Sequence, residues 1–157
     1  MTNAARILSD WIATVFRVGY LPLAPGTWGS LFALSAWVLL PVFTSVTYLA
    51  ILGGLLFLGI LTSRNYSAYS QKTDPSEVVI DEWLGMWIAL YAVPKEMTWM
   101  IVSFLLFRFF DVVKVPPARQ LERMHGGWGI MMDDVAAGLY ALRSEEHTSE
   151  LQSHLNL

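Results

Sequence analysis

A run of 46 residues without one charged side chain, residues 18–63, limits the folds open to this chain more than any other feature. About 20 apolar residues form a helix that crosses the hydrocarbon core of a bilayer, so the run is long enough for two such helices. Pro41 and the polar residues after it mark a turn between them. We therefore predict helices over residues 27–40 and 46–62. The alternative is a helical hairpin buried in a soluble protein.

The composition of the whole chain favours the membrane interpretation. Of its 157 residues, 55% are hydrophobic and 15% are charged, and the mean hydropathy is +0.47, whereas about 25% charge is usual in soluble domains. The length indicates a single domain. Because the chain has no cysteine, disulfides, thiolate metal sites and cysteine nucleophiles are excluded. The net charge of −3 indicates no nucleic-acid partner.

Further apolar segments predict helices over residues 78–93 and 97–110 and another that starts at residue 129. The first 20 residues are typical of an amphipathic lead-in helix rather than a signal peptide. We therefore expect an all-α protein, a compact membrane bundle of about four to five helices with its loops on the cytoplasmic side. The oligomeric state is left open by these patterns.

The last predicted helix changes from apolar to polar at Arg143. Residues 143–154 resemble the translation of a short-read sequencing adaptor fused to a truncated reading frame. We expect residues 1–142 to form one membrane domain with a truncated last helix, and residues 143–157 to be a non-native tail. The alternative is a genuine polar tail.

The basic residues predict the orientation of the bundle. If the predicted helices alternate in direction, Lys95 alone falls on one side. This bias identifies the other side as cytoplasmic, and the acidic clusters fall there too. Eight basic residues lie on that cytoplasmic side: Arg6, Arg17, Arg64, Lys72, Arg108, Lys114, Arg119 and Arg123.

Seven acidic residues from three segments face the same side. In a helical interpretation of residues 74–82, the first three acids share one helix face. Crowded carboxylates repel one another, and hard oxygen ligands favour Mg²⁺, so we predict a magnesium site. The alternative is that some cap helices, because acids are favoured at a helix start. The seven are Asp74, Glu77, Asp81, Glu82, Asp111, Asp133 and Asp134.

Candidate phosphate-binding groups lie near these acids. We expect Lys114, with Arg108 nearby, to bind phosphate, although cations here can also serve only to set the topology. The loop before the first apolar helix contains Pro25, Gly26 and Thr27. With Thr27 as the N-cap, the free N–H groups of this helix start suit an anion, unless the loop is merely a cap.

His125, in the loop beside Gly126, is a candidate general acid for a leaving alkoxide, or else a solvated loop residue. The chain lacks a cysteine phosphatase loop, an aspartyl-phosphate motif and a Walker loop. These absences favour attack on phosphorus by metal-activated water over covalent catalysis.

Four motifs together resemble the phosphatidylglycerophosphatase A family. They are Leu-Ala-Pro-Gly-Thr-Trp-Gly-Ser (23–30), Val-Ile-Asp-Glu-Trp-Leu-Gly-Met-Trp (79–87), Phe-Arg-Phe-Phe-Asp-Val-Val-Lys (107–114) and the segment from His125 to Gly138. Val115 departs from the family pattern, in which a proline directly follows the lysine.

The resemblance implies a Mg²⁺-dependent enzyme of the bacterial cytoplasmic (inner) membrane that hydrolyses phosphatidylglycerophosphate to phosphatidylglycerol and phosphate. It also implies a compact helical fold, with Lys114 at the phosphate. The residues that it assigns to metal binding are Asp81, Glu82, Asp111, Asp133 and Asp134.

Two other functions fit the same residues. One is a non-enzymatic membrane protein that carries divalent ions along an acidic, helix-lined path. The acids lie at one end of the predicted helices rather than at mid-membrane depth, which disfavours it. The other is a lipid-phosphate transferase, which would share the site and differ only in its products.

Overall fold

The computed structural model describes residues 2–116, 118–121, 124 and 126–155, and these residues form helices and no strand. The prediction of an all-α protein is therefore confirmed for this part of the chain, although its helices outnumber the four to five expected. The elements are α1 (Asn3–Ala13), the 3₁₀ helix η1 (Val18–Tyr20), α2 (Pro25–Leu39), α3 (Ser45–Ser70), α4 (Ile80–Ala89), α5 (Met97–Val113), α6 (Ala118–Leu121) and α7 (Gly127–Leu155).

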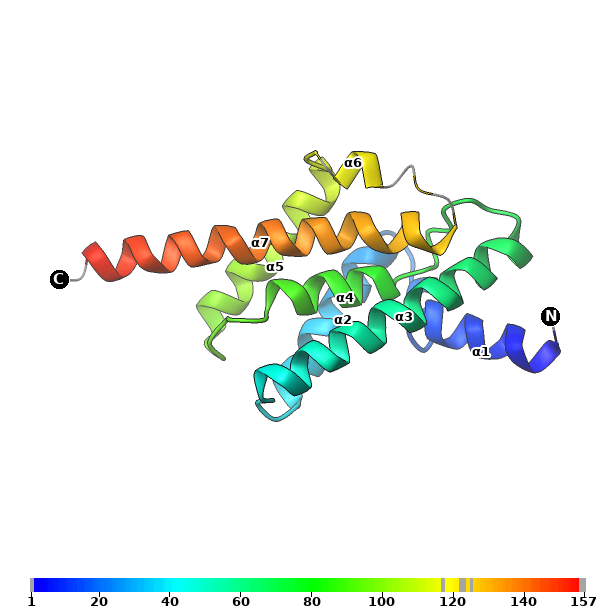
Figure 1. Cartoon of the computed structure of the whole chain (residues 1–157), viewed down its shortest axis with the longest axis horizontal. Helices are drawn as coiled ribbons and strands as arrows, with labels where there is room; N and C mark the ends of the chain where they lie inside the picture. The colour runs from blue at the N-terminus through cyan, green and yellow to red at the C-terminus, as the bar shows by residue number, and fades with distance from the viewer. Residues whose placement is uncertain (1, 117, 122–123, 125, 156–157) are drawn as a thin grey trace.

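The short helix α4 lies at the centre of the bundle and contacts α2, α3, α5 and α7 (Figure 1). Its residues 84–89 are all buried, as expected for a helix that is apolar on every side. The contact between α4 and α7 is backbone to backbone. A Cβ added at Gly138 would lie 2.4 Å from the carbonyl oxygen of Gly85, so only glycine fits there.

α3 is longer than predicted. The predicted helix ends at residue 62, whereas α3 continues through the polar residues 64–70 and ends at Ser70. This extension packs against α1, where the Asn65 amide donates to Ser9 Oγ at 3.1 Å. Contacts with α1 therefore stabilise a helical conformation that the polar composition of the segment did not indicate.

α4 is shorter than predicted, and this changes the arrangement of the acids. The helix starts at Ile80, and residues 71–79 are non-helical. Pro75 disfavours helix at the residue before it, and the amide of Val79 donates to the carbonyl of Ala13 at 2.9 Å, outside any helix. The expectation that residues 74, 77 and 81 share one helix face is therefore wrong.

α7 does not end where its sequence becomes polar. It runs from Gly127 to Leu155, and its C-terminal part projects beyond the other helices (Figure 1). Residues 144–155 include no proline or glycine, so their polar composition does not end the helix. That residues 143–157 are non-native stays a prediction.

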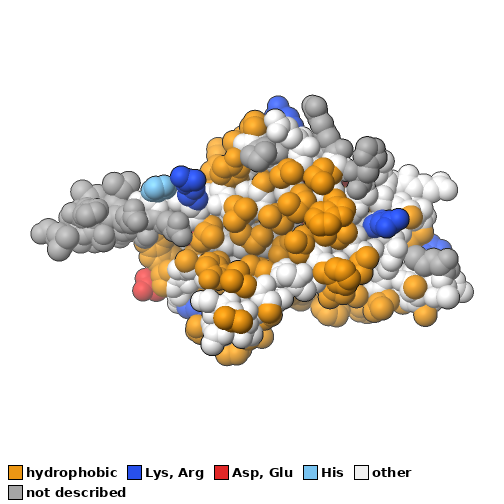
Figure 2. All heavy atoms as spheres, in the orientation of Figure 1, with side chains coloured by type: hydrophobic (Ala, Val, Ile, Leu, Met, Phe, Trp, Pro, Cys, Tyr) orange, Lys and Arg blue, Asp and Glu red, His pale blue; other side chains and the backbone are white. Residues whose placement is uncertain are grey.

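Within the described residues, α3 is the one helix long and apolar enough to cross a membrane. Only 17% of the residues in its most apolar stretch are buried inside the protein. The other apolar helices are short: α2 has 15 residues and α5 has 17. Many large hydrophobic side chains are nevertheless exposed, and Figure 2 shows hydrophobic side chains spread over the face that it presents. Helix length alone therefore does not confirm the multi-pass arrangement.

Candidate active site

Five helix ends converge on one cavity of about 640 Å³. The ends are the start of α2, the end of α3, the start of α4, the end of α5 and the start of α7. The helices alternate in direction along the chain, as the sequence predicted, and this alternation brings together motifs that lie more than 100 residues apart. The charged side chains that line the cavity are Asp74, Asp81, Glu82, Arg108, Asp111, Lys114, Asp133 and Asp134.

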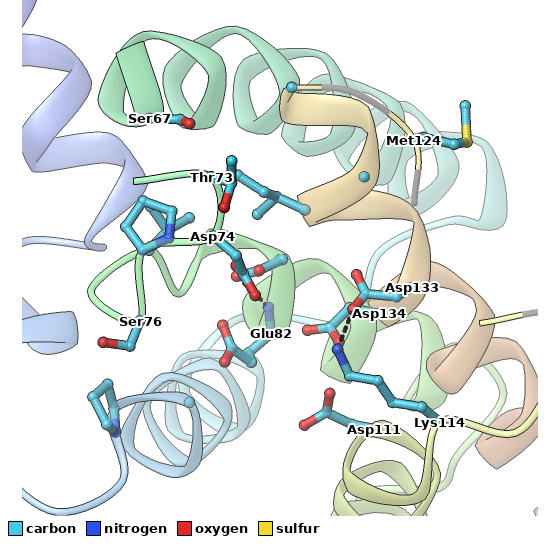
Figure 3. A pocket seen from close by; sticks show the side chains of 18 of the residues that line it. Ser67, Thr73, Asp74, Ser76, Glu82, Asp111, Lys114, Met124, Asp133 and Asp134 are labelled. Atoms are coloured by element: carbon cyan, nitrogen blue, oxygen red, sulfur yellow. Dashed lines mark hydrogen bonds and ion pairs between the residues drawn. The ribbon is translucent and has the colours of Figure 1, made fainter. Parts of the chain in front are cut away.

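Three carboxylates form the tightest group in the cavity. Asp81 and Glu82 lie in the first turn of α4, and Asp134 comes from α7. Glu82 and Asp134 are labelled in Figure 3. One oxygen atom of each lies within 4.8 Å of the others. Asp81 Oδ1 also accepts a hydrogen bond of 3.1 Å from the amide of Glu82, which orients that carboxylate. A single cation could contact all three groups.

Two cations lie at the rim of this acidic group. Lys114 Nζ forms an ion pair with Asp133 Oδ2 at 3.1 Å (Figure 3). The Arg108 guanidinium pairs with Asp111 at 2.7 Å. Arg108 also lies 3.4 Å from Ser30 Oγ, on α2. Lys114 adopts a left-handed conformation, with φ of 49°, that ends α5. Positive charge is thus available beside the carboxylates for an anionic ligand.

The pKa values of the acids reflect their crowding. Burial, and then repulsion from neighbouring carboxylates, raises the pKa of Asp81 and of Asp134 well above the ordinary value. Burial raises the pKa of Glu82. It also raises the pKa of Asp133 to about 6, although Lys114 acts in the opposite direction. Proton uptake or a bound cation would relieve this repulsion.

A divalent metal ion fits this group of residues. Glu82 Oε2 and Asp133 Oδ1 are buried and have no hydrogen-bond partner within the described residues. Buried carboxylate oxygens without a partner are costly, and carboxylate oxygens are the ligands that Mg²⁺ prefers. The donors therefore suit a hard cation held by Asp81, Glu82 and Asp134.

Not every predicted site residue lies in the cavity. Glu77 points instead to Lys72, whose Nζ lies 2.6 Å from Glu77 Oε1, and this cation lowers the pKa of Glu77. The structure therefore gives no support to Glu77 as a metal ligand. His125 lies outside the described residues.

The start of α2 also differs in detail from the prediction. The helix begins at Pro25, with Ala24 and not Thr27 in the N-cap position, because the fixed φ of proline suits the first helical residue. Pro25 and Gly26 line the cavity, whereas Thr27 does not. A Cβ on Gly26 would lie 2.1 Å from Glu82 Oε1, so glycine permits the close approach of α2 to the acids.

Sequence reasoning did not find the polar residues on the other side of the cavity. Ser67 lies in the part of α3 that continues beyond the predicted helix end, and Thr73 and Ser76 lie in the non-helical segment before α4 (Figure 3). The signal that could have revealed Ser67 was the absence of proline or glycine between residues 60 and 72. Without such a breaker, α3 can continue to the cavity.

Comparison with known proteins finds relatives over most of the chain. The family model for phosphatidylglycerophosphatase A matches residues 11–143. A Haemophilus influenzae protein named phosphatidylglycerophosphatase A is 38% identical over 134 residues, which cover 83% of this chain and 82% of that protein. An Escherichia coli protein of the same name is 35% identical over 130 residues, 82% of this chain and 76% of that protein.

A Bacteroides thetaiotaomicron protein with the provisional name phosphatidylinositol-3-phosphatase is 43% identical over 139 residues, which cover 83% of this chain and 86% of that protein. No solved structure matches the chain. The helical fold, the acidic cavity and these relatives define a phosphatase of phospholipid metabolism. The chain belongs to the phosphatidylglycerophosphatase A family.

Proposed function

We propose that this protein hydrolyses the terminal phosphate monoester of phosphatidylglycerophosphate to give phosphatidylglycerol and phosphate, and that the reaction depends on Mg²⁺. The observation that carries the proposal is that the carboxylates of Asp81, Glu82 and Asp134 meet two basic side chains in one cavity. The basic side chains are Lys114 and Arg108. Two relatives bear the name of this activity. The differently named Bacteroides protein also carries a name for action on a phosphate monoester of a phospholipid.

The residues divide into two roles in this proposal. Asp81, Glu82 and Asp134 would hold Mg²⁺, with Asp111 and Asp133 at its edge. When bound, Mg²⁺ supplies a Lewis acid that lowers the pKa of water and neutralises charge on the phosphoryl oxygens. The division is supported by the close spacing of the first three carboxylates and by the ion pairs of the other two.

Lys114 and Arg108 would orient the phosphate. Each already pairs with a carboxylate at the cavity, so each has its charge directed inward before substrate binds. At the start of α2, Pro25 has no amide hydrogen and Thr27 does not line the cavity, so the amide group of Gly26 would be the added donor. Such fixed donors stabilise the charge that spreads over the transferring phosphoryl group. His125 stays a candidate for protonating the leaving alkoxide.

The decisive experiment is phosphate release from phosphatidylglycerophosphate in detergent, with Mg²⁺ and with EDTA. We expect activity with Mg²⁺ alone, and a loss on the order of a hundredfold in Asp81→Asn. Glu96→Gln, an exposed acid outside the cavity, is the matched control and should keep full activity. Activity that is equal in EDTA, or unchanged in Asp81→Asn, would refute the metal role.

A substrate panel tests the lipid specificity. Phosphatidylinositol 3-phosphate run beside phosphatidylglycerophosphate should be the poorer substrate. The opposite order would assign this chain the activity named for its Bacteroides relative.

We also propose that the protein spans the bacterial cytoplasmic membrane several times, with the cavity on the cytoplasmic face. The eight-to-one distribution of basic residues and the exposed apolar side chains support this location. Because the chain has no cysteine, single cysteines introduced at Ser76 and at Glu96 can each be labelled in inverted vesicles, whose outer surface is the cytoplasmic face. We expect labelling from outside at residue 76 and from inside at residue 96. Labelling of both residues from the same side would contradict the topology.

A further inference from the structure

The segment between α1 and α2 has an unusual backbone. Val15, Phe16 and Arg17 are three consecutive residues in the left-handed region, with φ of 47°, 54° and 70°, and Leu23 has φ of 77°. None is glycine, and L side chains rarely adopt this conformation. Such a backbone persists only where surrounding contacts determine it, and it is often found where a segment has a function. We call residues 15–23 the hook.

The hook exposes apolar side chains. Leu23 is 101% exposed, Phe16 is 69% exposed and Tyr20 is 50% exposed. A segment whose conformation served only to fill the core would bury these groups, since each exposed apolar side chain forgoes the stabilisation of burial. Val15 is buried in the core at 5% exposed, so the left-handed segment anchors this side chain and directs Phe16 and Leu23 outward.

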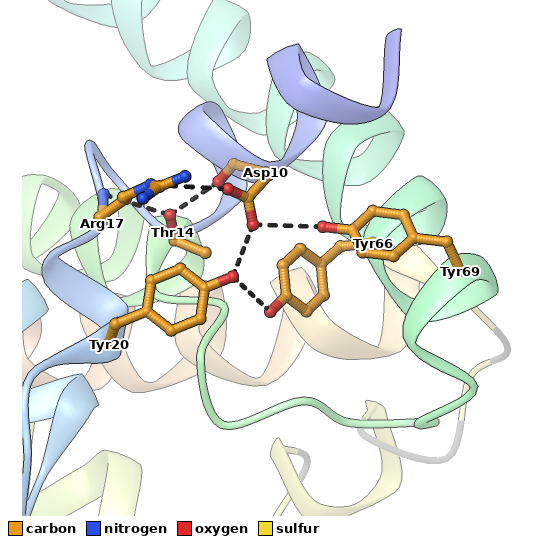
Figure 4. A network of polar contacts seen from close by, with 6 residues as sticks. All are labelled: Asp10, Thr14, Arg17, Tyr20, Tyr66 and Tyr69. Atoms are coloured by element: carbon orange, nitrogen blue, oxygen red, sulfur yellow. Dashed lines mark hydrogen bonds and ion pairs between the residues drawn. The ribbon is translucent and has the colours of Figure 1, made fainter. Parts of the chain in front are cut away.

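The hook is nevertheless fixed in position by hydrogen bonds. The Tyr20 hydroxyl donates to Asp10 Oδ1 at 2.6 Å and lies 3.0 Å from the Tyr66 hydroxyl, which ties it to α1 and α3 (Figure 4). At the other end, Trp28 Nε1 donates to the carbonyl of Pro22 at 3.2 Å. The exposed side chains are thus presented by a braced segment.

The hook leads directly into the active-site cavity. Leu23, its last residue, precedes Ala24, Pro25 and Gly26, and these three line the cavity. Acidic and basic side chains line the cavity, whereas the hook beside it exposes large apolar side chains. A phospholipid with a terminal phosphate has the same two parts, a charged end and an apolar end. The arrangement therefore matches a lipid that enters the cavity phosphate first.

A guanidinium group and an indole ring lie side by side at the start of the hook. The Arg17 guanidinium lies 5.4 Å from the centre of the Trp11 ring, and the rings of Trp11 and Phe16 are 6.4 Å apart. The Arg17 side chain is 61% exposed. Tryptophan and arginine side by side suit the headgroup region, where indoles are enriched and anionic phosphates attract cations.

We propose that the hook inserts into the surface of a phospholipid bilayer and forms the lip over which the lipid substrate enters the cavity. Leu23 and Phe16 would contact the acyl region while Arg17 contacts lipid phosphates. This inference rests on the proposed function, because it concerns the lipid end of the same substrate. It adds a membrane-contacting segment to a site otherwise defined only by its polar residues.

Insertion can be measured directly, because the chain has no native cysteine. Leu23→Cys carrying a bimane label would be reconstituted into nanodiscs of phosphatidylethanolamine and phosphatidylglycerol that contain a spin-labelled phospholipid as quencher. We expect strong quenching at residue 23. We expect weak quenching at Asn3→Cys, an exposed polar position at the start of α1. Equal quenching at both positions, or none at residue 23, would overturn the proposal.

Activity supplies the second test. Leu23→Asp should lose about tenfold of its turnover of long-chain phosphatidylglycerophosphate in vesicles, since a charge opposes insertion of the lip. It should lose far less on a short-chain analogue dissolved below its micelle concentration. Leu23→Met, which keeps the apolar side chain, should match the wild type on both substrates.

The outcomes separate the lip from the proposed activity. An equal loss on both substrates in Leu23→Asp, or no loss on either, would overturn the lip. If the wild-type protein hydrolysed neither substrate while bimane at residue 23 was quenched, the proposed function would fail and the membrane contact would stand.

Discussion

At the cavity, a single residue can matter because it lets two helices approach each other closely. Gly26 is the clearest case, because a Cβ there would lie 2.1 Å from Glu82 Oε1 and 3.3 Å from Arg108 Nη1. A glycine at the start of a helix is ordinarily explained as part of a loop. Here the lack of a side chain gives room to a carboxylate that we propose as a metal ligand.

Replacing Gly26 by alanine should therefore reduce activity with little effect on folding. The added methyl would displace the Glu82 carboxylate, and a misplacement near 1 Å can cost on the order of a hundredfold in rate. Phosphate release and the Mg²⁺ concentration for half-maximal activity would be measured together, and the latter should rise. Gly54→Ala, which meets no atom within 4 Å, is the control. An unchanged Mg²⁺ requirement in Gly26→Ala would contradict the assignment of Glu82.

Among the elements, α4 depends most on its neighbours. It has only ten residues, and it is surrounded by four other helices. Isolated helices of this length are marginal in water, so packing and not propensity maintains it. Since α4 carries Asp81 and Glu82 in its first turn, the packing of its far end against α7 helps to fix the position of both carboxylates.

The contact between Gly85 and Gly138 provides a test of this packing. Gly138→Ala should destabilise the protein by about 1–3 kcal/mol, because its Cβ would meet the Gly85 carbonyl at 2.4 Å. Gly53→Ala in α3 meets no atom within 4 Å and should stabilise by up to about 1 kcal/mol, through better helix propensity. Thermal unfolding in detergent would compare the two. A midpoint for Gly138→Ala at or above the wild-type value would show that α7 can shift freely.

The C-terminal part of α7 begins where the family match ends, at residue 143. Ser103 Oγ on α5 donates to Glu145 Oε1, and both side chains are buried, while Glu145 Oε2 has no partner within the described residues. A buried carboxylate oxygen without a partner is costly. We propose that residues 1–142 are the native domain and that residues 143–157 derive from an adaptor. The genomic reading frame would decide, since a frame that continues with these residues contradicts the proposal.

At the scale of the whole molecule, the acidic cavity makes stability depend on pH and on metal. Burial raises the pKa of Asp133 to about 6, against about 3.9 in an unfolded chain. A carboxyl group with a raised pKa favours the folded state while protonated. That stabilisation is complete below the unfolded pKa and is lost as the pH rises through about 6.

In EDTA, the unfolding midpoint should therefore fall as the pH is raised from about 5 to about 7. Mg²⁺ should raise the midpoint, and more at the higher pH, because metal ligands bind in the deprotonated form. Differential scanning fluorimetry with and without Mg²⁺ at both pH values measures this difference. A midpoint in EDTA that rises with pH, or a Mg²⁺ shift independent of pH, would contradict it.

The sequence by itself determined the helical class, the alternating direction of the helices and the clustering of the acids. These features depend on local hydrophobic patterning and on the order of the segments along the chain. Because alternate helices run in opposite directions, the motifs around residues 25, 81, 111 and 134 had to meet at one end. Family membership followed from the same motifs.

Only the tertiary structure decided which acids lie close enough together to share a cation and which do not. Glu77 lies close to Asp81 in sequence, yet the non-helical segment before α4 turns Glu77 towards Lys72, while Asp134 reaches Asp81 from another helix. The left-handed backbone of the hook also could not be predicted from the sequence, because the residues that adopt it are not glycines. Both features depend on contacts between distant segments, which override local preference and which a pattern along one segment cannot express.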